Sequence, residues 1–152
     1  MPPDCRCGEF TALPSSFESL QQRCASAAKI QPTLRHVATN PTTWLSVLEC
    51  GVCHQRWAKE WPFGELQAGG PACLYQIDAA DGDAWLATAK PRFDSLRRQH
   101  EDRQILELLG SEIGPEPCKR AGCVRKRIRF GVLCRTHHFE SLRGHLPAAD
   151  LE

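Results

Sequence analysis

The sequence has few aromatic residues and no long apolar run. Aromatic side chains make up 7% of the 152 residues, beside 11 glycines and 11 prolines, so we expect a modest core and substantial loops. The longest apolar stretches fall far short of the ~20 residues that a membrane span needs, which excludes a transmembrane protein. No basic start followed by an apolar run opens the chain, so we expect no signal peptide and a cytoplasmic location.

Cysteine, in contrast, is abundant. The chain has nine cysteines, an odd number that disulfides alone cannot pair. In a reducing compartment disulfides rarely persist. A modest core in a loop-rich chain often relies on metal crosslinks for stability. Metal binding is therefore the predicted role of most of these cysteines.

The net charge of +1 conceals an uneven distribution. Residues 1–75 carry 6 basic and 6 acidic side chains, residues 76–117 carry 5 and 9, and residues 118–152 carry 8 and 3. Charge segregation of this kind steers association with partners and selects among them. The acidic segment and the basic segment each offer a surface for such an interaction.

The N-terminal half predicts one helix and a small sheet. Ser15 and Glu18 match the S-x-x-E capping box, and apolar residues then recur at helical spacing until Pro32. Composition and turns predict an antiparallel sheet. Its expected strands cover residues 33–38, 44–49 and 73–77, the last after the turn Gly69-Gly70-Pro71. Helices and a small antiparallel sheet together predict an α+β fold.

The second half predicts further helices. Asp83 is the expected N-cap of a helix over 84–89. A longer helix is expected from about Phe93 to Leu109, with Gly110 as its stop. A short stiff linker, 114–117, then separates a domain over 1–114 from a basic segment over 115–152, which is expected to pack on it.

Three cysteines and a histidine follow one another at ligand spacing in this basic segment. They are Cys118, Cys123, Cys134 and His137. Zinc prefers four thiolate or imidazole ligands in a tetrahedron. Cys134 and His137 are three residues apart at the start of a helix expected over 135–146, so they project from the same side of its first turn. His138 is the alternative fourth ligand, and spacing favours His137.

The runs 118–123 and 131–137 together resemble a short zinc knuckle of bacterial and phage proteins, C-x4-C followed by C-x2-H. The resemblance covers only these two runs. It implies a bound zinc ion and a small treble-clef-like fold. It implies no activity.

A second set of four cysteines is divided between two distant parts of the chain. Its members are Cys5, Cys7, Cys50 and Cys53, with 42 residues between the two pairs. A long insertion is tolerated because the cost of loop closure grows only logarithmically with length. We expect a second structural zinc ion here, although Cys5 and Cys7 can also be read as terminal thiols.

Three other residues are alternative ligands for this first site. His54 adjoins Cys53 and can replace a cysteine. Cys24 and Cys73 lie in apolar segments, where a small thiol is more typical of a core residue than of a ligand. We therefore expect both to be buried in the core.

The segment 44–57, which contains Cys50 and Cys53, and the downstream Pro62, Glu65, Gly69-Gly70-Pro71 and Leu74 resemble small bacterial immunity-type proteins. Some of these proteins neighbour toxins. The resemblance implies a toxin-like protein partner and assigns no functional residue.

No catalytic motif accompanies the metal ligands. A catalytic zinc keeps one position for water, whereas both sets fill four positions with protein side chains. His138 and Glu140 match H-x-E, but the downstream P-C-x-x-C of zinc deaminases is missing. H-E-x-x-H, the P-loop and G-x-S-x-G are also missing. We expect no enzymatic activity.

Two functions fit these observations. The first is a protein-binding module stabilised by zinc, of the immunity or antitoxin type. The second is nucleic-acid binding, because basic clusters on small zinc modules often contact phosphates. The cations of this cluster are Lys119, Arg120, Arg125, Lys126, Arg127, Arg129 and Arg135. Phe130 is the only aromatic residue inside the cluster, so few bases could stack on it. The acidic segment 76–117 can also pair with the basic cluster. The protein partner is therefore preferred.

Overall fold

A computed structural model describes residues 5–63 and 70–147. Glu65 and Gly69, which contribute to the immunity-type resemblance, lie outside these ranges. The chain forms two compact units, Met1–Arg97 and Arg98–Glu152. In the described ranges, no helix is long and apolar enough to cross a membrane.

The boundary between the units lies earlier than the sequence places it, at 97/98 and not at 114. The reason is that the long helix α3 (Asp94–Leu109) binds the C-terminal segment. Arg143 Nε donates to the buried carboxylate of Asp102 at 2.9 Å, and Arg135 Nε donates to the carbonyl of Leu106 at 2.8 Å. Most of α3 therefore belongs to the second unit.

The first unit is built on a four-stranded antiparallel sheet, which together with the helices confirms the α+β class. The strands, in spatial order, are β1 (Leu34–Thr39), β2 (Ser46–Cys50), β3 (Arg56–Glu60) and β4 (Cys73–Ile77). Strand β3 was not expected from the sequence. Only five residues long and charged at three of them, it lacks the apolar alternation that signals a strand.

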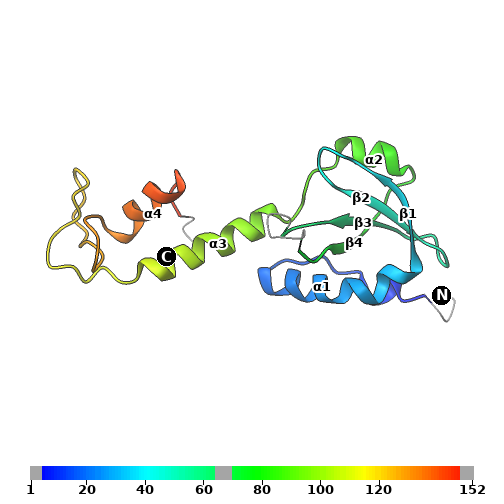
Figure 1. The fold of residues 1–152 in the computed structure, drawn as a ribbon, viewed down its shortest axis with the longest axis horizontal. Coiled ribbons are helices and arrows are strands. Elements are labelled where there is room, and N and C mark those ends of the chain that lie inside the picture. Colours follow the sequence, from blue (N-terminus) through cyan, green and yellow to red (C-terminus); the bar gives the residue numbers. More distant parts are fainter. Residues whose placement is uncertain (1–4, 64–69, 148–152) are drawn as a thin grey trace. The chain divides into compact units, whose positions relative to one another are not determined.

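Helices α1 (Phe17–Ile30) and α2 (Gly82–Thr88) lie on opposite sides of this sheet (Figure 1). Two buried clusters fill the space between the layers. The cluster that includes Leu86 of α2 also contains Cys24 and Cys73, which are both buried there. The other cluster joins the C-terminal half of α1 to the sheet and surrounds Trp57.

The starts of both helices differ by a residue or two from the predictions. Helix α1 has Ser16 as its N-cap, and Ser19 closes the capping box in place of the expected Ser15 and Glu18. A serine hydroxyl at the third helical position can accept the N-cap N–H as a glutamate does. Helix α2 is capped by Asp81, and not by Asp83, because the Asp81 carboxylate accepts the N–H of Asp83 at 2.9 Å.

A buried glutamate fixes the segment that leads into α3. Glu60, at the end of β3, is only 3% exposed. Its carboxylate accepts the backbone N–H groups of Arg92 and Phe93, each at 3.0 Å, and faces the Tyr75 hydroxyl at 3.5 Å. Burial raises the pKa of Glu60, although the two N–H groups oppose this shift. Glu60 thus supplies an acceptor for the two backbone N–H groups that directly precede α3.

In the second unit, α3 ends as predicted before Gly110, which has a φ of +70°. Helix α4 (Arg135–Arg143) is shorter than expected, because Gly144 adopts the left-handed conformation and ends it. Phe139 is fully buried, whereas Leu142 and Leu146 are exposed, so only part of the apolar side chains near this helix is covered.

Candidate metal centres

The first cluster brings together the four cysteines that the sequence selected. The Sγ atoms of Cys5, Cys7, Cys50 and Cys53 all lie within 4.8 Å of one another. Cys5 Sγ lies 3.2 Å from Cys53 Sγ and 3.9 Å from Cys50 Sγ. With Zn–S bonds of about 2.3 Å, a tetrahedral site of four thiolates has S···S edges of about 3.8 Å. The cluster therefore has the size of a metal centre.

Sheet formation brings its two halves together. Cys50 is the last residue of β2, and the next turn returns the chain through His54, whose φ is +59°. The N–H of His54 donates to the carbonyl of Cys50 at 3.0 Å and closes this turn. At the other half, Cys7 begins the short helix η1 (Cys7–Phe10), and its carbonyl accepts from Gln76 of β4 at 2.6 Å. The distant N-terminal pair is thus anchored to the sheet.

The thiols of this cluster influence one another's protonation. Burial and the neighbouring thiols raise the pKa of Cys7 far above its ordinary value. Burial also acts to raise the pKa of Cys50, but the N–H groups of Cys53 and Val52 outweigh it and lower that pKa to about 7. A thiol that ionises near neutral pH is prepared to bind a cation.

Trp57 belongs to the surroundings of the same cluster. Its indole N–H is fully buried and meets no oxygen or nitrogen acceptor. This N–H lowers the pKa of Cys7, opposing the effect of burial. Trp57 packs in one buried cluster with Cys5, Cys7 and Cys50. It therefore belongs to the immediate surroundings of these ligands, a place that no pattern in the sequence could identify.

The second cluster contains Cys118, Cys123, Cys134 and His137. His137 Nδ1 lies 3.3 Å from Cys118 Sγ and 3.2 Å from Cys134 Sγ, and Cys123 Sγ lies 3.9 Å from Cys134 Sγ. The neighbouring His138 lies outside the cluster, with a buried Nδ1 that has no hydrogen-bond partner. Among the described residues, His54, Cys24 and Cys73 also lie outside both clusters.

A knuckle, formed by residues 117–126, and the start of α4 position these ligands. The N–H of Cys118 donates to the carbonyl of Arg125 at 2.8 Å and closes the knuckle. Cys134 is the N-cap of α4, so its sulfur lies at the helix end that favours negative charge. Gly131 is required by close packing, because a Cβ there would lie 2.8 Å from Ile128 Cγ1.

The pKa values of two thiols in this cluster shift in opposite directions, which favours the thiolate form of Cys118 over that of Cys134. Burial acts to raise the pKa of Cys118, but N–H groups of Cys134 and Arg120 outweigh it and lower the pKa to about 6. Burial and the neighbouring thiols raise the pKa of Cys134 to about 11. The remaining ligands lose their protons when a cation binds, since metal binding releases protons from thiols.

Comparison of the chain with protein-family models, curated proteins and solved structures found no match. The metal centres therefore rest on geometry and donor type. Two clusters, each of four soft or borderline donors, can hold two metal ions. Four protein ligands occupy all the coordination positions of a tetrahedral zinc ion, which is the arrangement found in structural zinc sites.

Exchange of the two adjacent histidines distinguishes the ligand from its neighbour. We expect His137→Gln to lower the metal content from two ions per chain to one, because only His137 presents a nitrogen to the thiols. His138→Gln, the matched control, retains both ions. Elemental analysis of protein purified without chelator measures both variants. Loss of an ion from His138→Gln alone would contradict the assignment.

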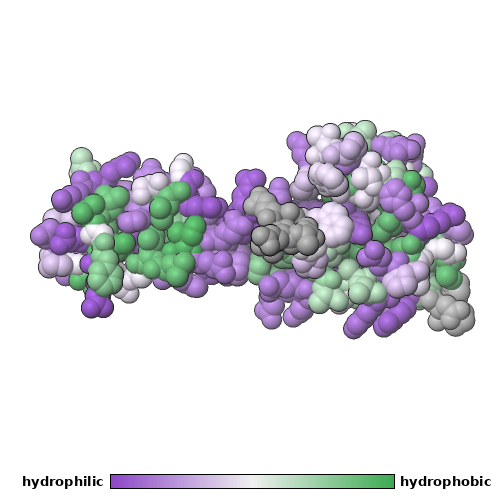
Figure 2. Space-filling model, in the orientation of Figure 1, coloured by the Kyte–Doolittle hydropathy of each residue, from purple (hydrophilic) through white to green (hydrophobic). Residues whose placement is uncertain are grey.

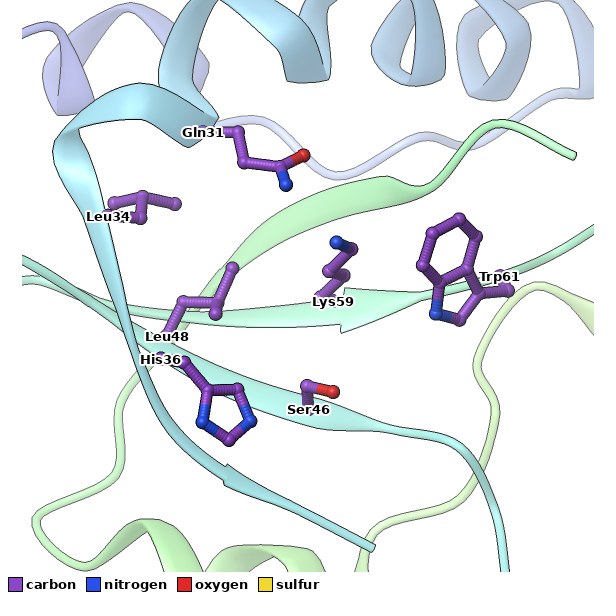
Figure 3. Close-up of a pocket in the computed structure, with 7 residues that line it drawn as sticks. All are labelled: Gln31, Leu34, His36, Ser46, Leu48, Lys59 and Trp61. Carbon is purple, nitrogen blue, oxygen red and sulfur yellow. The ribbon is translucent and has the colours of Figure 1, made fainter. Parts of the chain in front are cut away.

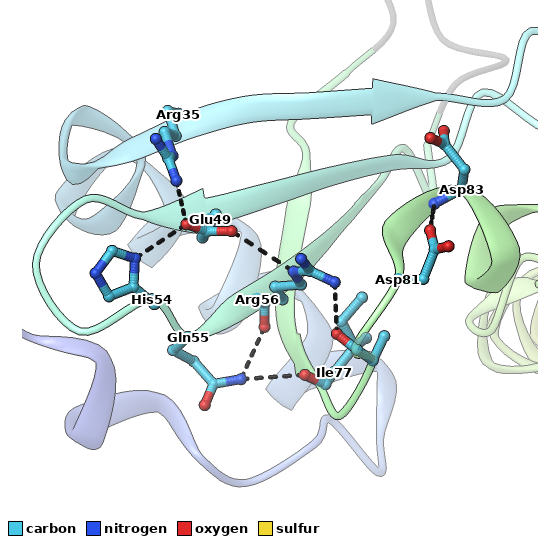
Figure 4. Close-up of polar contacts among 9 residues, drawn as sticks. Arg35, Glu49, His54, Gln55, Arg56, Ile77, Asp81 and Asp83 are labelled. Atoms are coloured by element: carbon cyan, nitrogen blue, oxygen red, sulfur yellow. Dashed lines mark hydrogen bonds and ion pairs between the residues drawn. The ribbon is translucent and has the colours of Figure 1, made fainter.

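A buried carboxylate with two arginines and a histidine around it lies beside the first cluster. Glu49 of β2 contacts Arg35, His54 Nδ1 at 3.1 Å and Arg56 Nε at 3.6 Å (Figure 4). His54 and Arg35 lower the pKa of Glu49 to about 2. His54, one of the alternative ligands, thus contacts the Glu49 carboxylate and lies outside the four-cysteine cluster.

This network predicts a pH-dependent contribution to stability. A carboxyl with a depressed pKa stabilises the fold above its unfolded value of 4.5, and the contribution is lost as pH falls from there toward about 2. Glu49→Gln is therefore expected to lower the thermal midpoint at neutral pH, with the gap to wild type narrowing on acidification. Glu9→Gln, which removes the exposed Arg6 pair, is the control and should change little. A gap that does not vary with pH would contradict the electrostatic cause.

Proposed function

We propose that this chain is a non-enzymatic protein-binding module whose two units are stabilised by two zinc ions. The exposed apolar surface of the second unit carries the proposal. Val124 is 94% exposed and Phe130 is 91% exposed, and both lie on loops that the second cluster joins. In the view of Figure 2, apolar residues gather on the visible face of the second unit. Large exposed apolar patches are typical of protein interaction sites.

The metal-closed knuckle supports such a surface because it limits its motion. The N–H of Lys119 donates to the carbonyl of Val132 at 2.9 Å, and the bridge between Pro117 and Lys126 pairs the two sides of the knuckle. A surface that is already ordered loses less entropy on binding. Thiolate-rich sets of four ligands favour zinc over harder cations, which supports zinc as the metal.

Ion pairs within the second unit support a protein partner over nucleic acid. Arg120 pairs with Glu140 at 3.4 Å, Arg125 with Glu112 at 3.0 Å and Arg127 with Glu116 at 2.9 Å. Phosphate binding gains its affinity from cations that neutralise phosphates and release counterions. Pairing with carboxylates of the same unit reduces the charge available for this purpose.

The remaining cations indicate the charge of the partner. In the described part of the chain, no carboxylate lies within ion-pair distance of Lys119, Lys126 or Arg129. Arg129 instead lies 5.0 Å from the ring centroid of Phe130. Exposed apolar side chains in a segment with unpaired cations, such as Phe130 beside Arg129, are complementary to an apolar surface that also carries acidic residues. In its concrete form, the proposal is that the chain is an immunity or antitoxin-type protein. Its partner would be a toxin whose surface has this apolar and acidic character.

A photo-crosslinking amino acid at position 124 tests the proposal by identifying the partner. The purified partner is then titrated calorimetrically with wild type, Phe130→Ser and Leu13→Ser. We expect Phe130→Ser to weaken binding by about 100-fold, as for a central aromatic contact. Leu13→Ser, which changes an exposed apolar residue of the first unit, should bind as wild type. Equal affinity of all three proteins would contradict the assigned surface.

Nucleic acid is tested with the same protein. Fluorescence anisotropy with duplex DNA and single-stranded RNA, at two salt concentrations, measures how affinity depends on salt. A plot of log affinity against log salt concentration has a slope of about −0.9 for each phosphate contact on duplex DNA. We expect at most weak and sequence-indifferent binding. Sub-micromolar, sequence-selective binding at physiological salt would replace the proposal with a nucleic-acid function.

A further inference from the structure

One face of the sheet in the first unit carries a hollow of about 270 Å³. Its walls come from β1, β2, β3 and the residues that flank them (Figure 3). The register explains why they meet, because Leu48 lies opposite Trp57 and Ser46 lies opposite Lys59, so Ser46, Leu48 and Lys59 share one face. Trp61, just after β3, closes one end.

The polar groups that line this hollow are an ammonium, a hydroxyl, an imidazole and an amide. Lys59 extends into it between Leu48 and Trp61, with its ammonium 4.7 Å from the Trp61 ring centroid. Ser46 is only 9% exposed, and its hydroxyl lies 2.8 Å from Thr39 Oγ1, which in turn contacts His36 Nε2 at 2.8 Å. The amide of Gln31 completes the polar lining.

Among the residues that the structure describes, the hollow has no acidic counterpart for its cation. No carboxylate of residues 5–63 or 70–147 lines it or pairs with Lys59. Three guanidinium groups of the first unit do have a carboxylate partner, since Arg6 pairs with Glu9, and Arg35 and Arg56 pair with Glu49. An ammonium that has no carboxylate partner in the described part of the chain, and that lies beside hydroxyl, imidazole and amide groups, fits a carboxylate ligand.

We propose that this hollow binds a glutamate or aspartate side chain of the protein partner, together with an apolar neighbour on the same segment. The inference rests on the proposed protein-binding function and names the chemistry that the first unit recognises. Its volume lies below the roughly 300–1,000 Å³ of small-molecule pockets, so it suits one anchoring side chain. Leu34, Leu48 and Trp61 supply apolar contacts beside the ammonium.

Defined peptides test the hollow without the partner. The probes are acetyl-Leu-Glu-Leu-amide and the matched acetyl-Leu-Gln-Leu-amide, titrated into ¹⁵N-labelled full-length protein with zinc bound. We expect saturable shifts of the Trp61 indole and of the Ser46 and Lys59 amides with the glutamate peptide. Affinity should fall by about tenfold or more in Lys59→Met and persist in Lys59→Arg, because the charge-assisted contact is lost only in the first.

Each outcome of this experiment bears on the hollow alone. Equal shifts with the glutamine peptide, no shifts at these residues, or unchanged affinity of Lys59→Met would overturn the inference. Free glutarate, titrated in parallel, should bind more weakly than the peptide. Equal binding of glutarate would overturn the choice of a protein segment. The proposed function has its own test at Phe130 of the second unit, so the two can fail separately.

Discussion

Cys134→Ser is expected to remove one of the two zinc ions and to unfold the second unit. Cys134 is fully buried, caps α4 and lies within contact distance of both Cys123 and His137. The apolar core around it is small, with Leu106, Ile128 and Phe139 as its fully or nearly buried members. Zinc ligation contributes on the order of 10 kcal/mol to the folding of small modules, so the remaining contacts cannot replace it.

The matched control exchanges a buried cysteine that is not a ligand. Cys24→Ser lies in the core of the first unit and outside both clusters, so it should keep two zinc ions. Its cost is the burial of a hydroxyl in an apolar site, about 1–3 kcal/mol. Elemental analysis gives the zinc content, and amide NMR spectra show which unit loses dispersion. Equal zinc loss in both variants would mean that the ligand set is wrong.

Glu60→Ala is expected to destabilise the first unit by about 2–6 kcal/mol, because two N–H groups lose their acceptor and each one left without a partner costs about 1–3 kcal/mol. The N–H groups of Arg92 and Phe93 both lose their acceptor. Urea unfolding monitored by tryptophan fluorescence measures the change. Glu60→Gln keeps a carbonyl acceptor of similar size and is the matched control, with a much smaller expected loss.

The pH dependence of Glu60 is opposite to that of Glu49. Burial raises the pKa of Glu60 above its ordinary value of 4.5, so the folded state binds the proton more tightly than the unfolded chain. Stability linked to this group is therefore fully present below the unfolded pKa and declines as pH rises through the folded pKa. Glu60→Gln should remove this decline. Its persistence in the variant would assign it to another group.

The ligands of both clusters could be predicted because their spacing is a property of the chain itself. Cys50 and Cys53, like Cys134 and His137, are close enough in sequence for one turn to present them together. The choice of His137 followed from helical spacing, and the structure places it beside the thiols. The ends of α1, α2 and α4 were less accessible, because several neighbouring serines or aspartates can cap a helix equally well.

Features that depend on strand register could not be predicted. Without β3 in the predicted sheet, nothing places Lys59 beside Ser46 or Arg56 beside Glu49. Trp57 and Cys7 share one buried cluster because the N-terminal segment is held against β4. These contacts join residues far apart in sequence, and their pattern becomes visible only when all four strands are aligned.

The different spans of the two clusters have a consequence for the kinetics of metal uptake. The ligands of the second cluster lie between residues 118 and 137, so a short chain closure assembles them. In the first cluster, two ligands precede α1 in the sequence and the other two follow β1. The two pairs meet when Gln76 of β4 holds the N-terminal segment. Contacts between distant residues form slowly because loop closure precedes them. Zinc added to the unfolded chain should therefore enter the second cluster rapidly and the first only as the sheet assembles.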